Sequence, residues 1–327
     1  MTQVRYYDVF NGDADGICAL HQLRLADPLD SVLVTGLKHD IALLDRVAAR
    51  EGDVVTVLDI SLDRNRPALL RLLGQGVHVR YFDHHYAGDI PVDRDLEPII
   101  DTGGAACTSA LVDRHLAGRH RAWAVVGAFG DGLADLAGRL AASLWLDADA
   151  LDELRELGNT LNYNAYGTTL ADVTLPPKAT YRLVHQYEDP FDLIAREPVI
   201  RGIARQRLDD LDHAMGAPAL RRSPFAEAYV LPDATWSRRV SGEFANRLAA
   251  GAPHKAFAVV TPLTGGDFGV SVRSPRGRTP FVVDLCRTFE TGGGRREAAG
   301  IEKLRQRNLE RFLEAFEHAW APAEAHA

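Results

Sequence analysis

The chain has 327 residues, 46% of them hydrophobic, and a formal net charge of −8 at pH 7. These values are ordinary for a soluble globular protein with room for two cores, and the negative charge argues against a protein that coats long nucleic acid. No apolar run reaches the length of a membrane span, so we expect no membrane partner. Three widely separated cysteines give no disulfide framework, and the N-terminus shows no signal-peptide pattern, so we expect a cytoplasmic protein.

The first half of the chain alternates between strand and helix patterns. Strand-like runs lie at 4–10, 31–35, 54–58 and 77–83, and helical patterns separate them at 17–25, 41–50 and 68–73. Strands joined by helical crossovers predict an α/β domain with a doubly wound parallel sheet. Further helical patterns follow at 105–116, 123–129, 136–145 and 151–161, and we expect them to close one end of the sheet.

The second half predicts a smaller α+β domain. Residues 190–224 hold helical segments, charges and the breakers Pro218 and Pro224, which favours a helical connector. Strand patterns follow at 226–231, 256–261 and 268–273, with helical patterns at 244–250 and 302–320. The predicted domains are therefore 1–189, a connector over 190–224, and 225–327.

Acidic residues and histidines follow three of the predicted strands. Asp13 and Asp15 come after the first strand, Asp59 after the third, and Asp83-His84-His85 after the fourth. Ligands bind open parallel sheets at the carboxyl ends of their strands. Carboxylates and imidazoles together suit manganese, zinc or iron better than calcium. The alternative is that Asp83 caps the next element and the two histidines are surface residues.

Asp131 adds a carboxylate at another unexpected position. It follows the apolar run 123–129, in the sequence Gly130-Asp131-Gly132, where a buried pattern is otherwise expected. A buried charge without a partner is costly, so a metal ion would explain it.

Four motifs in this order resemble those of the DHH phosphoesterases. They are Asp13-Ala14-Asp15-Gly16, Asp59 after a strand, Asp83-His84-His85, and Gly127-Ala128-Phe129-Gly130-Asp131. That superfamily includes RecJ-type single-strand exonucleases, nano-RNases, cyclic-dinucleotide phosphodiesterases, exopolyphosphatases and manganese pyrophosphatases. The resemblance implies a hydrolase that acts on phosphoesters.

The resemblance also implies a metal centre and its ligands. Two divalent ions, Mn²⁺ ahead of Mg²⁺, would share Asp59 as a bridging carboxylate and activate a water for attack at phosphorus. The remaining ligands would be Asp13, Asp15, His84 and Asp131. His85 would face the phosphoryl group and, with Asp83 and Arg273, complete the catalytic residues.

A second glycine-rich stretch resembles the DHH-associated substrate-binding domain. Gly292-Gly293-Gly294-Arg295 is expected to open a helix, whose free N–H groups would bind an anion. Arg273 and Ser274, at the end of the strand 268–273, would hold the substrate with this loop. The alternative is a glycine turn with solvated arginines.

Three positions depart from the family pattern. Arg295 stands where a histidine usually contacts substrate, and Val9 stands where smaller members have a metal-binding histidine. Asn11 occupies the first position of the RecJ-type Asp-x-Asp-x-Asp and offers a neutral oxygen to metal or substrate. His39 is an alternative source of the missing ligand. A missing ligand predicts one tightly bound and one weakly bound metal ion, or an altered reaction.

Three classes of function follow. The first is a phosphoesterase acting on short oligonucleotides or nucleotide phosphates, and the second is a RecJ-like exonuclease that binds single-stranded nucleic acid. The third is a catalytically altered regulatory protein that binds phosphate or nucleotide, as Val9 and Arg295 suggest. A homodimer is left open.

Overall fold

The computed structural model describes residues 3–275, 277 and 281–320, and it divides into two compact units, Met1–Arg205 and Gln206–Ala327. The division falls within helix α9 (Pro198–Met215), which lies in the segment that the sequence predicts as a connector.

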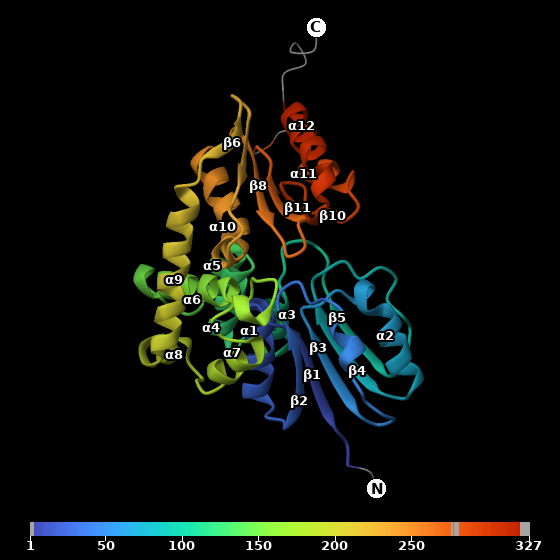
Figure 1. Cartoon of the computed structure of the whole chain (residues 1–327). Coiled ribbons are helices and arrows are strands. Elements are labelled where there is room, and N and C mark those ends of the chain that lie inside the picture. Colours follow the sequence, from blue (N-terminus) through green and yellow to red (C-terminus); the bar gives the residue numbers. More distant parts are fainter. Residues whose placement is uncertain (1–2, 276, 278–280, 321–327) are drawn as a thin grey trace. The chain divides into compact units, whose positions relative to one another are not determined.

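The first unit is built on a five-stranded parallel sheet with the order β2-β1-β3-β4-β5 (Figure 1). The strands are β1 (Tyr6–Asn11), β2 (Ser31–Gly36), β3 (Val54–Leu58), β4 (His78–Asp83) and β5 (Leu96–Ile100). The predicted doubly wound α/β fold is confirmed. The chain runs outward from β1 to β2 and then returns to β3, so the strand order reverses at β1, where such sheets bind ligands.

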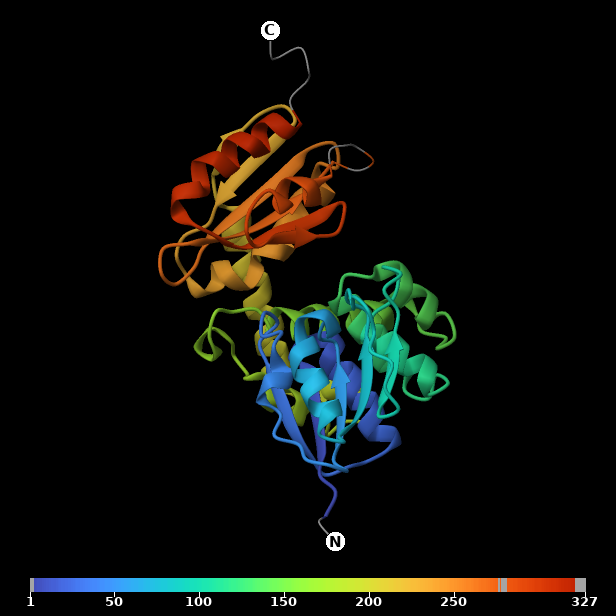
Figure 2. The same ribbon diagram turned by 90° about the vertical axis from the view of Figure 1, so that its right-hand side faces the viewer.

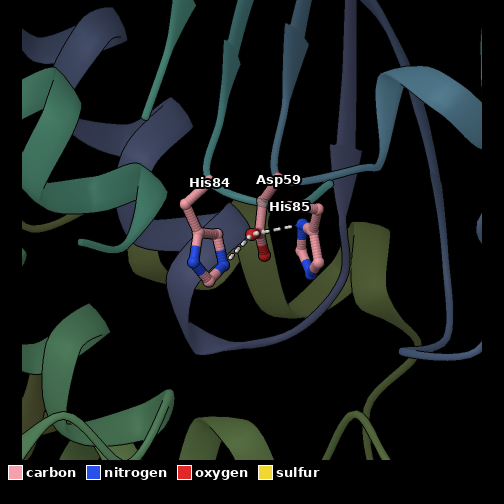
Figure 3. Close-up of side chains that lie close together, drawn as sticks. All are labelled: Asp59, His84 and His85. Atoms are coloured by element: carbon pink, nitrogen blue, oxygen red, sulfur yellow. Dashed lines mark ion pairs between the residues drawn. The ribbon is translucent and has the colours of Figure 1, made fainter. Parts of the chain in front are cut away.

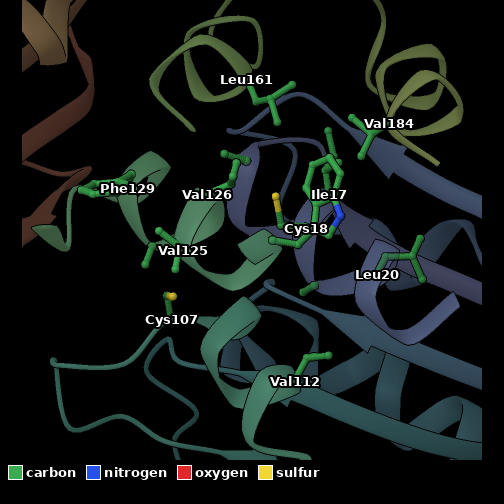
Figure 4. Close-up of a cluster of buried hydrophobic side chains, with 14 of the residues drawn as sticks. Ile17, Cys18, Leu20, Cys107, Val112, Val125, Val126, Phe129, Leu161 and Val184 are labelled. Carbon is green, nitrogen blue, oxygen red and sulfur yellow. The ribbon is translucent and has the colours of Figure 1, made fainter. Parts of the chain in front are cut away.

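Alternating strand residues divide the interior of this unit into two cores. On one face, α2 (Leu62–Gly74) packs against Tyr7, Val9, Val55, Val57, Val79 and Tyr81. On the other face, Phe10, Leu58 and Phe82 pack against α1 (Ala14–Ala26) and the helices α3 (Thr108–His115) and α4 (Arg121–Gly130). Figure 4 shows part of this second core. Both faces are covered because successive side chains of a strand point in opposite directions.

More helices complete the first unit. They are α5 (Ala134–Ala141), α6 (Ala148–Tyr163), α7 (Pro177–Val184) and α8 (Pro190–Arg196). Glycines allow close crossings here: a Cβ at Gly130 would strike the Ala14 side chain of α1, and a Cβ at Gly158 would strike the Val126 carbonyl of α4. Among the described residues, no helix is long and apolar enough to cross a membrane.

The helix predicted at 41–50 does not form, and a short 3₁₀ turn at Leu43–Arg46 stands in its place. The Asn65 side chain of α2 explains this difference, because it donates to the Ile41 carbonyl and accepts from the Leu44 N–H. Two backbone groups of the segment are thus bonded to a side chain instead of to other groups of an α-helix. Strand β5 was not predicted; it contains Pro98 and lies at the sheet edge, where proline is tolerated.

The second unit contains a six-stranded sheet with the order β10-β11-β9-β8-β7-β6. The strands are β6 (Ala219–Arg222), β7 (Ala226–Val230), β8 (Ala256–Pro262), β9 (Phe268–Arg273), β10 (Gly292–Gly294) and β11 (Ala298–Leu304). Only the β7–β8 pair is parallel among these strands. Helices α11 (Val282–Arg287) and α12 (Leu309–Ala319) share one core with the sheet, and α10 (Thr235–Gly251) packs on β8 and β9 (Figure 2). This is the predicted α+β arrangement.

The glycine stretch does not open a helix, which corrects the prediction. Gly292–Gly294 is strand β10, which pairs antiparallel with β11, and the Arg295 N–H donates to the Ala298 carbonyl at 2.9 Å to close the turn. The final helix consequently starts at Leu309 rather than at residue 302. Gly292 must lack a side chain because a Cβ there would strike the Cys286 carbonyl.

A buried ion pair joins β1 to α1 in the first unit. Asp8 is fully buried and Arg24 is 4% exposed, and two guanidinium nitrogens of Arg24 donate to the Asp8 carboxylate at 2.6 and 2.8 Å. The Ser31 hydroxyl also donates to this carboxylate at 2.6 Å. A buried carboxylate that loses its cation is left with an uncompensated charge.

We predict that Arg24→Met lowers the free energy of unfolding by about 3–5 kcal/mol, because Asp8 would stay buried without its partner. The matched control is Arg196→Met, whose exposed pair with Asp192 should contribute less than about 0.5 kcal/mol. Urea denaturation of both variants measures the difference. Similar losses in the two variants would contradict the prediction.

Candidate metal centre

The carboxyl ends of β1, β3 and β4 bring the predicted metal ligands together. Asp13 caps the N-terminus of α1 directly after β1, Asp59 follows β3, and Asp83 is the last residue of β4. These strands are neighbours in the sheet, so their carboxyl ends share one edge. Sequence positions far apart therefore meet where a ligand is expected.

Asp59, His84 and His85 lie close together, as Figure 3 shows. Their ligand atoms all lie within 4.8 Å of one another. Asp59 Oδ1 lies 3.4 Å from His84 Nε2 and 3.9 Å from His85 Nδ1. The Asp59 carboxylate and the His84 imidazole together form a donor set for manganese, zinc or iron, and His85 lies beside them.

Asp59 has an unusual backbone conformation. Its φ of 61° is in the left-handed region, which non-glycine residues rarely adopt. The Asp59 N–H donates to the Phe82 carbonyl at 3.0 Å, and the Thr108 hydroxyl donates to its carboxylate at 3.1 Å. Backbone strain of this kind persists where surrounding contacts enforce it, and it is frequent at functional sites.

Asp15 is held by the N-terminus of α3. Its two carboxylate oxygens accept from the N–H groups of Thr108 and Ser109 at 2.7 and 2.8 Å. The side chain lies 3.9 Å from His84 Nε2. The free N–H groups at the start of α3 therefore bind the Asp15 carboxylate, and this contact positions Asp15 beside His84.

Asp131 reaches the same histidine from the end of α4. Its Oδ2 lies 3.9 Å from His84 Nε2. Gly127 of the same helix lies against Ser109 and Asp15, where a Cβ would overlap the Ser109 hydroxyl. The glycines of the predicted fourth motif thus allow α4 to approach α1 and α3.

Lys38 is a residue of the centre that the sequence reasoning missed. Its ammonium lies 2.5 Å from Asp13 Oδ2 and 3.0 Å from Asn162 Oδ1. Burial raises the pKa of Asp13, but the Lys38 charge and hydrogen bonds from Lys38, Gly16 and Asp59 lower it to about 2. Lys38 follows β2 and belongs to none of the four motifs, so no local signal identified it.

Asp83 orients His85. The His85 Nδ1 donates to Asp83 Oδ1 at 2.8 Å, and this pairing raises the pKa of His85 against the lowering effect of burial. Asp83 Oδ2 is buried and has no hydrogen-bond partner among the described residues. An imidazole fixed at one nitrogen by a carboxylate presents its other nitrogen in a defined direction.

Buried carboxylates without enough cations make the centre suited to a metal ion. Burial, together with the charges of Asp13, Asp15, Asp131 and Asp83, raises the pKa of Asp59 well above its ordinary value. Burial also raises the pKa of Asp131, although the Lys38 charge lowers it. A divalent cation would relieve this repulsion, so the donor set and the unpartnered oxygen of Asp83 both fit a metal.

Three other predicted positions have different surroundings. The Asn11 amide accepts from the Asp13 N–H at 3.3 Å and donates to the Lys38 carbonyl at 3.4 Å. Val9 is fully buried in the core on the α2 face, and His39 is exposed. Asn11 therefore shapes the turn after β1, whereas Val9 supplies no ligand.

The predicted substrate residues of the second unit lie around the β9–β11 pair. The Arg273 guanidinium donates to the Asn246 side chain at 2.7 Å and to the Gly242 carbonyl at 3.2 Å, so it is tied to α10. Ser274 Oγ is buried and has no partner among the described residues. Gly292–Gly294 pairs with β11, and Arg295 forms the turn between these strands.

The fold was compared with solved structures. An exonuclease RecJ bound to manganese is 18% identical over 96% of this chain and 90% of its own, with a TM-score of 0.60. RecJ from Thermus thermophilus in complex with Mn²⁺ is 16% identical, with a TM-score of 0.63; the match covers 96% of this chain and 51% of that one. The pGpG-specific phosphodiesterase PggH from Vibrio cholerae is 13% identical, with a TM-score of 0.53, over 95% of this chain and 97% of its own.

No family model matches the sequence, and a search of curated proteins gives no match. At these identities the structural likeness concerns the fold. The chain shares its fold with these RecJ and PggH structures, which agrees with the resemblance that its four motifs carry.

We predict that Asp59→Asn stabilises the metal-free protein, because the substitution removes a buried like charge while asparagine tolerates the left-handed backbone. The melting temperature in chelator should rise by at least about 2–4 °C, the change that 1 kcal/mol gives in a unit of this size.

The same variant should lose the stabilisation that Mn²⁺ gives to the wild type, since a ligand of the folded state would be weakened. Thermal unfolding with chelator and with Mn²⁺ provides both measurements. A lower melting temperature in chelator would show that carboxylate repulsion does not govern this centre.

Proposed function

We propose that this protein, which has the DHH-superfamily fold, is a metal-dependent phosphoesterase. The observation that carries the proposal is the convergence of Asp59, His84 and His85 at the carboxyl edge of the sheet. Further carboxylates surround this group, and Lys38 pairs with one of them, Asp13. A bound divalent ion, Mn²⁺ ahead of Mg²⁺, would activate a water and neutralise charge on the phosphoryl group.

The residues of the centre would have different roles in the reaction. Asp59 and His84 would be the central ligands, with Asp15 and Asp131 completing the ligand set around His84. His85, oriented by Asp83, would donate to a phosphoryl oxygen and stabilise its charge. In hydrolysis the water oxygen bonds to phosphorus, the bond to the leaving oxygen breaks, and the leaving oxygen takes up a proton. Two ions sharing Asp59 are the arrangement that the family resemblance implies.

We propose short oligonucleotides or nucleotide phosphates as the substrates. The chain matches PggH over nearly the full length of both proteins, and that protein is named as a phosphodiesterase specific for pGpG. The −8 charge also favours a small substrate held by local cations over a long polyanion.

A RecJ-like exonuclease is the second candidate, favoured by the likeness to two RecJ structures and by the Asp13-Ala14-Asp15 form of the first motif. Binding to long single strands would distinguish it, because affinity that falls steeply with salt marks many phosphate contacts. Metal binding without turnover of any phosphoester would instead select the regulatory alternative.

We predict Mn²⁺-dependent hydrolysis within a defined panel of phosphoesters. The panel contains an aryl phosphodiester, short RNA and DNA oligomers, pGpG, phosphoadenosine phosphate, a cyclic dinucleotide and polyphosphate. The Asp83→Ala/His84→Ala variant should lose activity by on the order of 100-fold or more, because it removes a ligand and the group that orients His85.

The matched control is His78→Gln, at the other end of the same strand, where the imidazole is exposed and pairs with Asp95. It should keep wild-type activity. Absence of turnover by folded wild type on every compound, despite bound metal, would reject the phosphoesterase proposal.

We further propose that Arg273, Ser274, Arg295 and the Gly292–Gly294 segment of the second unit bind a phosphate group of the substrate. Support comes from the buried, unpartnered Ser274 hydroxyl, which follows the strand end that carries Arg273. The glycine strand lies in the same sheet, with Gly294 opposite Ala299 and Ala298 opposite Arg273. The hairpin backbone, rather than a helix N-terminus, would approach the phosphate.

We predict that Ser274→Ala raises KM about 10-fold for the preferred substrate with little change in kcat, because a hydrogen bond to a charged group would be lost. Ser271→Ala in the same strand is the control and should leave KM unchanged. Steady-state kinetics separate the two parameters. An unchanged KM in Ser274→Ala would exclude Ser274 from the binding residues.

A further inference from the structure

Lys38 is built into the metal centre rather than placed on the surface. Its side chain is 26% exposed, while Asp13, to which it donates, is 3% exposed. Asn162 of α6 accepts a second hydrogen bond from the ammonium, and the centroid of the Tyr166 ring lies 5.5 Å away. The ammonium is therefore surrounded by groups that favour a positive charge.

The backbone of Lys38 is also fixed. Its N–H donates to the Ala165 carbonyl at 3.1 Å, and its carbonyl accepts from the Asn11 side chain at 3.4 Å. The residue is thus held by the loop after α6 and by the turn after β1. A flexible surface lysine would lack these constraints, so the position of its charge is a property of the fold.

The Asp13 side of the centre differs from the Asp59 side in its available ligands. Asp13 Oδ1 accepts from the Gly16 N–H at 3.1 Å, and its Oδ2 bears the ammonium. Asn11 is engaged in the turn, and Val9 lies in the hydrophobic core. Asp59, by contrast, lies between two imidazoles. Asp13 therefore already has a cation, the Lys38 ammonium, whereas Asp59 lies among side chains that can bind a metal ion.

The Lys38 ammonium and a divalent ion would not both fit against the Asp13 carboxylate. Two metal ions of a phosphoryl-transfer centre lie about 3.5–4 Å apart and use the same carboxylates. A second ion at this position would need Asp13 Oδ2, the atom that the Lys38 ammonium already contacts. Either the lysine or a second metal ion can therefore lie against Asp13.

We propose that the Lys38 ammonium takes the place of a second metal ion, so that the centre binds one divalent ion, on the side of Asp59 and His84. The inference rests on the proposed metal-dependent function and modifies the number of ions that the family resemblance implies. Lysine supplies a fixed single charge that cannot be removed by a chelator. The chain would then combine one exchangeable cation with one permanent cation.

The test is the number of Mn²⁺ ions bound by the full chain, measured by calorimetric titration and by elemental analysis after desalting. We expect one ion per chain and the six-line electron paramagnetic resonance spectrum of an isolated Mn²⁺. Two ions per wild-type chain, with a spin-coupled spectrum, would overturn the inference. Absence of bound Mn²⁺ would instead reject the proposed metal centre, so the two failures are distinguishable.

Variants test whether Lys38 is the cause. Lys38→Met should increase the number of bound ions from one to two, because it releases Asp13, whereas Lys38→Arg should keep it at one. Lys178→Met, on the exposed surface of α7, is the matched control and should also bind one ion. A single ion in Lys38→Met would overturn the role of the ammonium.

Loss of the ammonium leaves Asp13 buried without its partner, so Lys38→Met should be less stable than the wild type in chelator. The double variant Asp13→Asn/Lys38→Met removes both charges and should fold while binding one ion. Circular dichroism establishes the folded state of each variant before the titration. Two ions in the double variant would contradict the assignment of the second position to Asp13.

Discussion

Repulsion between buried carboxylates at the carboxyl edge of the parallel sheet is the constraint on which the first unit depends. Each carboxylate has its own source of positive charge or hydrogen bonds. The N-terminus of α3 supplies two N–H groups to Asp15, Lys38 supplies an ammonium to Asp13, and His85 donates to Asp83. Asp59 accepts a hydrogen bond from the Thr108 hydroxyl, and burial and the neighbouring carboxylates raise its pKa well above its ordinary value. The remaining deficit of positive charge is what a divalent ion would supply.

This convergence requires backbones to approach more closely than most side chains permit. Gly127 and Gly130 let α4 pass close to α1 and α3, which delivers Asp131 to His84. Asp59 adopts a left-handed backbone at the end of β3. Strain and desolvated charge both cost stability, and the two cores on the faces of the sheet offset that cost. The same sheet that buries the hydrophobic residues therefore positions the polar ones.

Local sequence patterns predicted most of this arrangement, because strand ends that carry charge are visible without knowledge of tertiary contacts. The strands before Asp59 and Asp83 are apolar and β-branched or aromatic, so their ends were predictable. Lys38 was not, because its role depends on Asn162, distant in sequence, and on a loop conformation. The glycine stretch at 292–294 was misassigned for a similar reason: glycine is compatible with a helix start and with a hairpin, and pairing with β11 decides between them.

The chain itself sets the surroundings of Asp13, because Lys38 and Asn11 both contact it. Val9 fills the core beneath β1 and supplies no ligand to the centre. A lysine at position 38 then satisfies the carboxylate that would otherwise be left without a cation. Asn11 completes this arrangement, since a neutral amide can accept from the Asp13 N–H and donate to the Lys38 carbonyl, whereas a carboxylate could not donate. Positive charge near Asp13 is thus provided by the chain itself, through the Lys38 ammonium.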